Sequence, residues 1–167
     1  MKMRKEMLAH KRDSGPVCET AFRWLADHSF IQSIAVFAAL PGEPDLTELV
    51  ARHPDRKWVY PKVVGEHLAF YVVEDPAMDL SPGAFGILEP TAAQPEVAIG
   101  EIDAFICPGL AFDAKGGRLG RGRGFYDRTL AMARPSAVRI GVCFENQLVP
   151  DTYSEAHDVM MNQVISA

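Results

Sequence analysis

Apolar residues occur along the chain in short uninterrupted runs and, between these runs, in stripes at helical spacing. An apolar run bounded by glycine, proline or charged residues is typical of a strand buried on both faces of a sheet. The runs that predict strands lie at residues 33–39, 57–63, 68–73, 103–109 and 138–144, and a short last strand is predicted at 163–166.

Charged segments with an apolar stripe predict helices over residues 2–12, 17–28 and 125–133. We expect Ser14-Gly15-Pro16 to separate the first two helices. The run from Asp45 to Glu48 resembles a capping box and predicts the start of another helix. Residues 75–100 are rich in proline, alanine and glycine, which predicts a long connection, and connections of that length are usually functional or mobile.

The alternation of strands and helices predicts an α/β fold with a mostly parallel sheet and helices on both faces. This is the three-layer arrangement of Rossmann-like and sugar-phosphate-isomerase-like folds. A chain of 167 residues is of ordinary size for one domain, so we expect a single domain over residues 1–167. In such sheets ligands bind at the carboxyl ends of the strands.

Composition narrows the class of protein. Hydrophobic residues make up 48% of the chain and charged residues 23%, as in ordinary soluble domains. The net charge of −5 disfavours a nucleic-acid partner, and no apolar run approaches the ~20 residues of a membrane span. The N-terminus has no secretory pattern. Cys18, Cys107 and Cys143 are widely spaced, which indicates free thiols. We therefore expect a cytoplasmic monomer without membrane or nucleic-acid partners.

Residues 116–124, here called the glycine loop, carry the densest chemical signal. Five of the nine residues are glycine, and Arg118, Arg121 and Arg123 lie among them. Glycine lets backbone N–H groups approach a ligand, and arginine offers forked donors to phosphate oxygens. The loop lies between a predicted strand and a predicted helix, an arrangement that suits anions. It matches neither the dinucleotide nor the Walker A motif, and a flexible solvent loop is the alternative.

Asp127, three residues after the glycine loop, has two interpretations. It could cap the helix that starts there, or it could coordinate Mg²⁺ beside a bound polyphosphate, because Mg²⁺ prefers carboxylate oxygen and water.

The segment Pro108-Gly-Leu-Ala-Phe-Asp113, continued through Gly116 to Phe125-Tyr126-Asp127, resembles the 5-formyltetrahydrofolate cyclo-ligase family, whose pattern is P-G-x-x-F-D-x-x-G-x-R-L-G-x-G-x-G-Y-Y-D. Other parts of the chain match the family in the same order. These are the strand from Phe37 to the Glu43-Pro44-Asp45 turn, Tyr60-Pro61-Lys62-Val63, Phe85-Gly-Ile-Leu-Glu89-Pro90 and Ala156-His157-Asp158. The resemblance covers nearly the whole chain.

The resemblance implies a ligase that uses ATP and Mg²⁺ to convert 5-formyltetrahydrofolate to 5,10-methenyltetrahydrofolate, with ADP and phosphate as products. Its partners would then be small molecules, the folate and ATP. The implied ATP-binding residues are Lys2, Arg4, Arg118, Leu119, Gly120, Arg121, Gly122, Arg123, Gly124, Phe125 and Tyr126. The implied folate-binding residues are Phe37, Ala38, Glu43, Phe85, Glu89, Arg121, Gly122, Arg123, Gly124 and Phe125. The implied catalytic residues are Lys62, Arg121 and Arg123, and the implied metal ligands are Asp127 and Asp158.

The chain departs from the family pattern at several positions. The N-terminus is short, so that the family's ATP-binding lysine has no counterpart except Lys2. Leu46 stands where the substrate turn usually has threonine, and Asn162 where aspartate is common. Two other readings therefore stay open: an α/β protein that binds a nucleotide or sugar phosphate but has another substrate, and a non-catalytic module that binds RNA through its arginine–glycine run.

Overall fold

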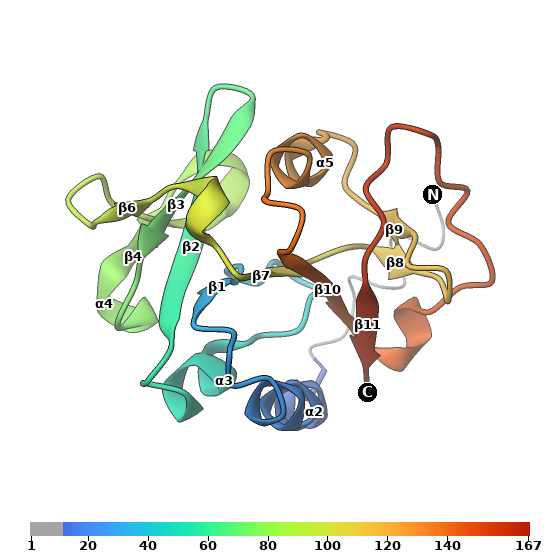
Figure 1. The fold of residues 1–167 in the computed structure, drawn as a ribbon, viewed down its shortest axis with the longest axis horizontal. Helices are drawn as coiled ribbons and strands as arrows, with labels where there is room; N and C mark the ends of the chain where they lie inside the picture. The colour runs from blue at the N-terminus through green and yellow to red at the C-terminus, as the bar shows by residue number, and fades with distance from the viewer. Residues whose placement is uncertain (1–11) are drawn as a thin grey trace.

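A computed structural model describes residues 12–167. Lys2 and Arg4, and the predicted helix that carries them, lie outside this range. The fold is built on a seven-stranded sheet with the order β11-β10-β7-β1-β2-β3-β6 (Figure 1). The strands in that order are β11 (Gln163–Ser166), β10 (Val138–Cys143), β7 (Ala104–Cys107), β1 (Ser33–Ala35), β2 (Lys57–Val64), β3 (His67–Val72) and β6 (Glu96–Val97).

The prediction of a mostly parallel sheet is confirmed. The first five strands in the spatial order run parallel, whereas β3 is antiparallel to both of its neighbours. Parallel strands need cover on both faces, and β7 shows why this sequence suits them, since all four of its residues, Ala104 to Cys107, are buried. The β2–β3 hairpin turns at Gly65, whose φ of 62° lies in the left-handed region.

Helices cover both faces of the sheet, as predicted. Helices α2 (Gly15–Ala26) and α3 (Thr47–Arg52) lie on one face, and α5 (Phe125–Leu130) lies on the other (Figure 1). Two apolar clusters fill the layers between the helices and the sheet. In the cluster beneath α5, Phe70 and Phe105 pack edge to face with ring centroids 5.7 Å apart.

Two expectations about helix starts are wrong. Helix α2 begins at Gly15, two residues before the predicted start, with Ser14 as its N-cap and Pro16 in its first turn, where the N–H that proline lacks has no helical partner. The predicted separation from a first helix involves residues outside the described range. The capping box is also absent. The Asp45 carboxylate accepts a hydrogen bond from the Thr47 N–H (3.0 Å), so the chain turns one residue later than predicted and α3 begins at Thr47.

The segment predicted as a long connection contains regular structure. Residues 75–100 form α4 (Pro76–Asp79), a hairpin of β4 (Leu80–Pro82) and β5 (Leu88–Pro90) joined by the 3-10 turn η1 (Ala84–Gly86), and then β6. A second 3-10 turn, η2 (Ile99–Glu101), leads into β7. These elements were not visible as periodicity because each spans only two to four residues.

The glycine loop also contains a strand. Strand β9 (Arg118–Leu119) pairs with β8 (Ala111–Phe112), which gives the start of the loop a fixed register. A further 3-10 turn, η3 (Glu145–Gln147), follows β10. Cys18, Cys107 and Cys143 are buried free thiols, as predicted. Within residues 12–167, every helix is too short or too polar to cross a membrane.

Candidate active site

A cleft with a volume of about 680 Å³ opens at the carboxyl ends of β1 and β7. The topology accounts for its position. From β1 the chain crosses through α3 to β2, and from the neighbouring β7 it crosses through α5 to β10, on the other side. Because the two crossovers diverge, the strand ends between them are left uncovered, which is where open α/β sheets bind ligands.

The cleft brings together the residues that the sequence singled out. Of the predicted site residues within 12–167, Lys62 is the one that does not line it. The predicted residues that line the cleft are Phe37, Ala38, Glu43, Phe85, Glu89, Arg118, Leu119, Gly120, Arg121, Gly122, Arg123, Gly124, Phe125, Tyr126, Asp127 and Asp158. They come from segments that are widely separated in the chain, so the fold alone assembles them.

Gly124 joins the glycine loop to α5. It is the N-cap of that helix and has φ 69°, in the left-handed region that favours glycine. Its carbonyl accepts the first helical hydrogen bond, from the Arg128 N–H (3.1 Å). The Arg128 side chain in turn donates to the carbonyls of Arg123 (2.8 Å) and Glu66 (2.8 Å). The end of the loop is thereby tied to the turn between β2 and β3.

Of the two glycine-loop arginines for which an ion pair is found, Arg118 is the more buried, and its side chain is only 7% exposed. One terminal nitrogen donates to the Pro108 carbonyl (3.1 Å), and the other lies 3.8 Å from the Asp127 carboxylate. The guanidinium also stands 5.2 Å from the centre of the Tyr126 ring. Its Nε–H has no hydrogen-bond partner among the described residues. A buried donor without a partner is costly, and a phosphate oxygen would satisfy it.

Arg121 and Glu43 connect the loop to the substrate strand, since Arg121 Nε lies 3.3 Å from Glu43 Oε1. Burial raises the pKa of Glu43, and this effect exceeds the opposing influence of the Leu40 N–H and of Arg121. A buried carboxyl with a raised pKa in a cleft is a candidate for hydrogen bonding to a polar heterocycle.

Aromatic side chains form another wall of the cleft. Phe85 projects from η1 with φ 59°, an unusual value for a residue with a side chain. The Arg123 guanidinium lies over the Phe85 ring at 3.6 Å, and Phe125 packs against the same ring with centroids 6.1 Å apart. This wall could hold a flat heterocycle, because ring faces and guanidinium planes both stack on such rings. Phe37 is instead almost fully buried.

Glu89 is held mainly by the protein itself. Its Oε1 accepts hydrogen bonds from the Val63 and Ala84 N–H groups, both at 3.3 Å, and its Oε2 lies 3.5 Å from Lys62 Nζ. The side chain thus fastens the β4–β5 hairpin to β2. Lys62 therefore contacts a cleft residue, Glu89, without lining the cleft itself.

Asp127 does not cap α5, so that alternative is wrong. Its Oδ1 accepts a hydrogen bond from the Val159 N–H (3.0 Å), which brings Asp158 to the same part of the cleft. Both carboxylates are about one quarter exposed. Among the described residues no group of three or more His, Cys, Asp or Glu could hold a metal ion. Two hard carboxylates in a cleft fit Mg²⁺ that completes its shell with phosphate oxygens and water.

Sequence reasoning missed several cleft residues on the segment 149–162, here called the C-terminal loop. These are Thr152, Tyr153, Glu155 and His157. Sequence reasoning also gave no role to Asp113, whose side chain is buried beside the C-terminal loop. The sequence did contain one signal for Asp113, the Asp-x-x-Gly spacing at residues 113–116, which is typical of a turn. In such turns the aspartate carboxylate often accepts a hydrogen bond from the N–H group two residues onward.

Asp113 is a strongly hydrogen-bonded carboxylate. Burial by itself raises the pKa of a carboxyl group, but hydrogen bonds from the Thr152 hydroxyl and from three backbone N–H groups outweigh it. The pKa of Asp113 is thereby lowered from 3.8 to about 2. The charged form is favoured by folding.

The contribution of Asp113 to the stability of the protein should depend on pH. A lowered pKa in the folded protein means that Asp113 stabilises the fold above its ordinary pKa of 3.8 and loses that contribution as the pH falls through about 2. Between these values, we expect the stability difference between wild type and Asp113→Asn to shrink as the pH falls. Urea unfolding of both proteins over this range measures it, and a constant difference would contradict the assignment.

Comparisons with known proteins agree with the geometry of the cleft. The model of the 5-formyltetrahydrofolate cyclo-ligase family matches residues 2–167. The 5-formyltetrahydrofolate cyclo-ligase of Mycolicibacterium smegmatis is 45% identical over 49% of this chain and 43% of its own length. That of Haemophilus influenzae is 31% identical over 80% of this chain and 75% of its own. The match to the first of these relatives therefore spans less than half of that protein.

A solved structure resembles the whole fold. The solution structure of Aquifex aeolicus 5,10-methenyltetrahydrofolate synthetase has a TM-score of 0.82 and 28% identity to this chain. The superposition covers 99% of this chain and 86% of that one.

Proposed function

Because this chain belongs to the 5-formyltetrahydrofolate cyclo-ligase family, we propose that it converts 5-formyltetrahydrofolate to 5,10-methenyltetrahydrofolate with consumption of ATP. The observation that carries the proposal is the position of the glycine loop. Its arginines, two carboxylates and an aromatic wall all face one cleft, so a triphosphate and a flat heterocycle can meet there.

The reaction needs activation of a formamide, whose oxygen is a poor leaving group. In the proposed reaction the formyl oxygen attacks the γ-phosphorus, and the bond from that phosphorus to the bridging oxygen breaks to release ADP. N10 then attacks the activated formyl carbon and loses its proton. Cleavage of the carbon–oxygen bond releases phosphate and leaves the methenyl bridge. Charge on the transferring phosphoryl oxygens must be stabilised throughout, so donors and positioning do most of the work.

The residues divide this work between two ends of the cleft. Arg118 and Arg121, with the glycine backbone, would hold the phosphates. The Phe85–Arg123 wall and Glu43 would orient the pterin. We do not assign Lys62 the catalytic role that the family resemblance implied, because its ammonium group pairs with Glu89.

Asp127 and Asp158 would hold Mg²⁺ in this proposal. When bound, the cation neutralises charge on the phosphates of the nucleotide. The protein's own contribution is to orient the two carboxylates, through the Val159 N–H on Asp127 and the Glu155 N–H on Asp158 (2.7 Å).

A direct assay tests the proposed function. Purified protein with 5-formyltetrahydrofolate, ATP and Mg²⁺ should form the methenyl product, followed by its absorbance, with one ADP released per product. Omission of ATP, or chelation of Mg²⁺, should abolish the signal. Tight binding of Mg-ATP without any product would reject the proposal and favour a nucleotide-binding protein with another substrate. A salt-sensitive gel shift with RNA would instead revive the binding-module reading.

A further inference from the structure

The C-terminal loop, residues 149–162, carries Asp158 into the cleft without a helix or strand of its own. A segment of this length without regular structure must be held by individual contacts if it is to present a side chain at a defined place. Figure 1 shows it beside the β8–β9 hairpin. The contacts of the loop with that hairpin, together with the bond from the Val159 N–H to Asp127 on α5, therefore decide where Asp158 lies.

Asp113 makes the densest of these contacts. Its Oδ1 accepts hydrogen bonds from the N–H groups of Lys115 and Gly117, both at 2.9 Å, which closes the turn that leads into β9. Its Oδ2 accepts from both the Thr152 N–H (2.9 Å) and the Thr152 hydroxyl (2.7 Å). One carboxylate thus joins the start of the glycine loop to the C-terminal loop. It is 2% exposed and does not line the cleft.

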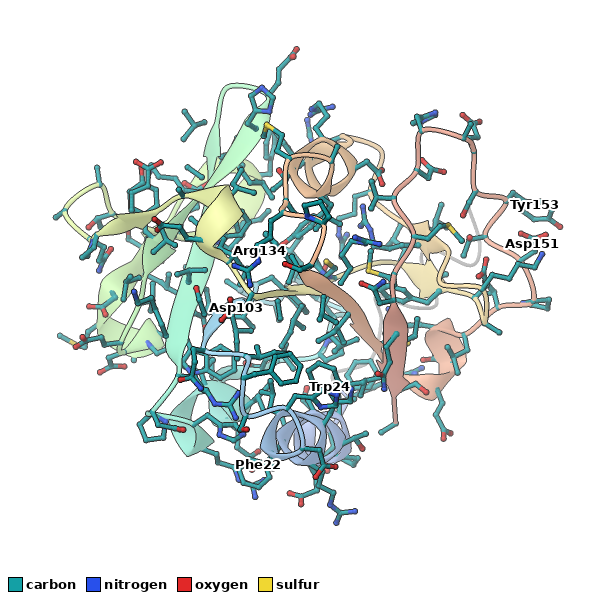
Figure 2. The ribbon with its side chains drawn as sticks, viewed as in Figure 1. Phe22, Trp24, Asp103, Arg134, Asp151 and Tyr153 are labelled. Atoms are coloured by element: carbon teal, nitrogen blue, oxygen red, sulfur yellow. The ribbon has the colours of Figure 1, made fainter. Side chains whose placement is uncertain are left out.

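The chain around Thr152 is shaped to present that residue to Asp113. The Asp151 carboxylate accepts a hydrogen bond from the Tyr153 N–H (2.7 Å), and Tyr153 has φ 55°. Figure 2 shows the side chains of Asp151 and Tyr153 at the outer surface of the molecule. The loop therefore makes a tight turn whose middle residue faces inward.

Backbone contacts extend this junction on either side. The Val149 N–H donates to the Phe112 carbonyl (2.9 Å), and the Met161 N–H donates to the Gly116 carbonyl (2.7 Å). These two bonds fix the ends of the C-terminal loop. Between them, Thr152 holds the first half of the loop to Asp113, and the Val159 N–H and the Met160 carbonyl hold the second half to Asp127 and Arg139. Asp158 lies between Thr152 and Met161, next to the Val159 N–H that binds Asp127.

We propose that Asp113 is a positioning residue which, through Thr152, holds Asp158 beside Asp127 and so sets the affinity of the cleft for Mg²⁺ with nucleotide. This inference rests on the proposed function for the identity of the metal and nucleotide. Partners in the outer shell of a metal site typically change metal affinity about 10- to 100-fold when they are mutated. Asn at position 113 has one acceptor oxygen, so it cannot satisfy both the turn and Thr152.

The test is the Mg²⁺ concentration that half-saturates ADP binding, measured by calorimetry on the full chain. We expect Asp113→Asn to raise that concentration about tenfold or more. Asp103→Asn is the matched control. Asp103 also joins distant segments, by accepting from the Gln32 and Ser33 N–H groups and pairing with Arg134, but it does not line the cleft (Figure 2). The Asp103→Asn variant should be less stable than wild type, but the Mg²⁺ concentration that half-saturates its ADP binding should be unchanged.

Hydrogen exchange supplies a readout that does not depend on turnover. In Asp113→Asn without ligand, amides in residues 150–160 should exchange faster, whereas those of the distant strand β3 should exchange as in wild type. An unchanged Mg²⁺ requirement, or unchanged exchange in residues 150–160, would overturn the proposal. If Asp113→Asn fails to fold, Thr152→Val should show the same two effects to a smaller extent, and Thr152→Ser should restore both.

The outcomes separate this inference from the proposed function. Protein that binds Mg-ADP but makes no methenyl product would defeat the proposed function, while the ADP-binding and exchange measurements would still decide the role of Asp113. Protein that binds no ADP with Mg²⁺ at all would defeat both.

Discussion

Replacement of Arg121 with alanine should lower kcat for methenyl formation about 100- to 1,000-fold, the usual loss when one donor to a developing negative charge is removed. Arg121 is the loop arginine that spans the cleft, since its Nε lies 3.3 Å from Glu43 Oε1. Its loss would remove positive charge from the phosphate end and take from the buried Glu43 carboxyl its ion-pair partner, while the Leu40 N–H bond remains. The pKa of Glu43, which burial already raises, should then rise further.

The effect on stability should be small by comparison, because Arg121 is 35% exposed and Glu43 can take up a proton. Arg121→Lys should recover part of the lost activity, since lysine keeps the charge but not the forked donors. Arg23→Ala is the matched control, because Arg23 is an exposed arginine that also pairs with a glutamate, Glu19. Steady-state kinetics measures the effect of each variant on kcat, and thermal unfolding measures its effect on stability. An Arg121→Ala enzyme with wild-type kcat would refute the role of Arg121 in the reaction.

Replacement of Gly116 with alanine should destabilise the protein by about 3 kcal/mol, from overpacking together with a left-handed backbone. The added Cβ would lie 2.3 Å from the Met161 carbonyl oxygen, and φ at Gly116 is 93°. The neighbouring atom is backbone and cannot rotate away. For a chain of this size the loss corresponds to a fall in Tm of roughly 6 to 12 °C.

Two other glycines separate the steric overlap of the added Cβ from the strain of the left-handed backbone. Gly122 has φ 94° but nothing within 4 Å of an added Cβ, so Gly122→Ala should cost only the conformational part, about 1 to 2 kcal/mol. Gly100 has open space and no positive φ, so Gly100→Ala should be nearly neutral. Denaturant unfolding of the three variants measures the series. Equal stability of the Gly116 and Gly100 variants would show that the close approach to Met161 is not maintained.

The fold class could largely be predicted from the sequence, because most of the apolar runs are long enough to indicate buried strands. Strands β2, β3, β10 and β11 agree with their predicted bounds to within one residue. The shorter elements could not be predicted, because two- to four-residue strands such as β4, β6 and β9 have no measurable period. They exist because of particular contacts, as when Glu89 fastens the β4–β5 hairpin to β2.

The cleft was predictable wherever its residues form a motif. The glycine loop, Asp127 and the Phe85–Glu89 segment all carry local signals, and all of them line it. Thr152 and Tyr153 carry no such signal, because their place in the cleft depends on the path of the C-terminal loop. Arg118 shows the same limit in another way. Its Nε is buried and has no hydrogen-bond partner within residues 12–167, a property that depends on the groups around it in space and not on its neighbours in the chain.

The order of residues by itself determined that the sheet is mostly parallel, that helices cover it, and that a loop rich in glycine and arginine follows one strand, because each of these features depends on residues close together in the chain. Only the tertiary structure decided that Arg121 meets Glu43 and that Asp113 holds Thr152, pairs separated by 78 and 39 residues. Contacts across such separations are specified by the packing of the whole sheet, which brings the carboxyl ends of β1 and β7 together. No local pattern encodes them.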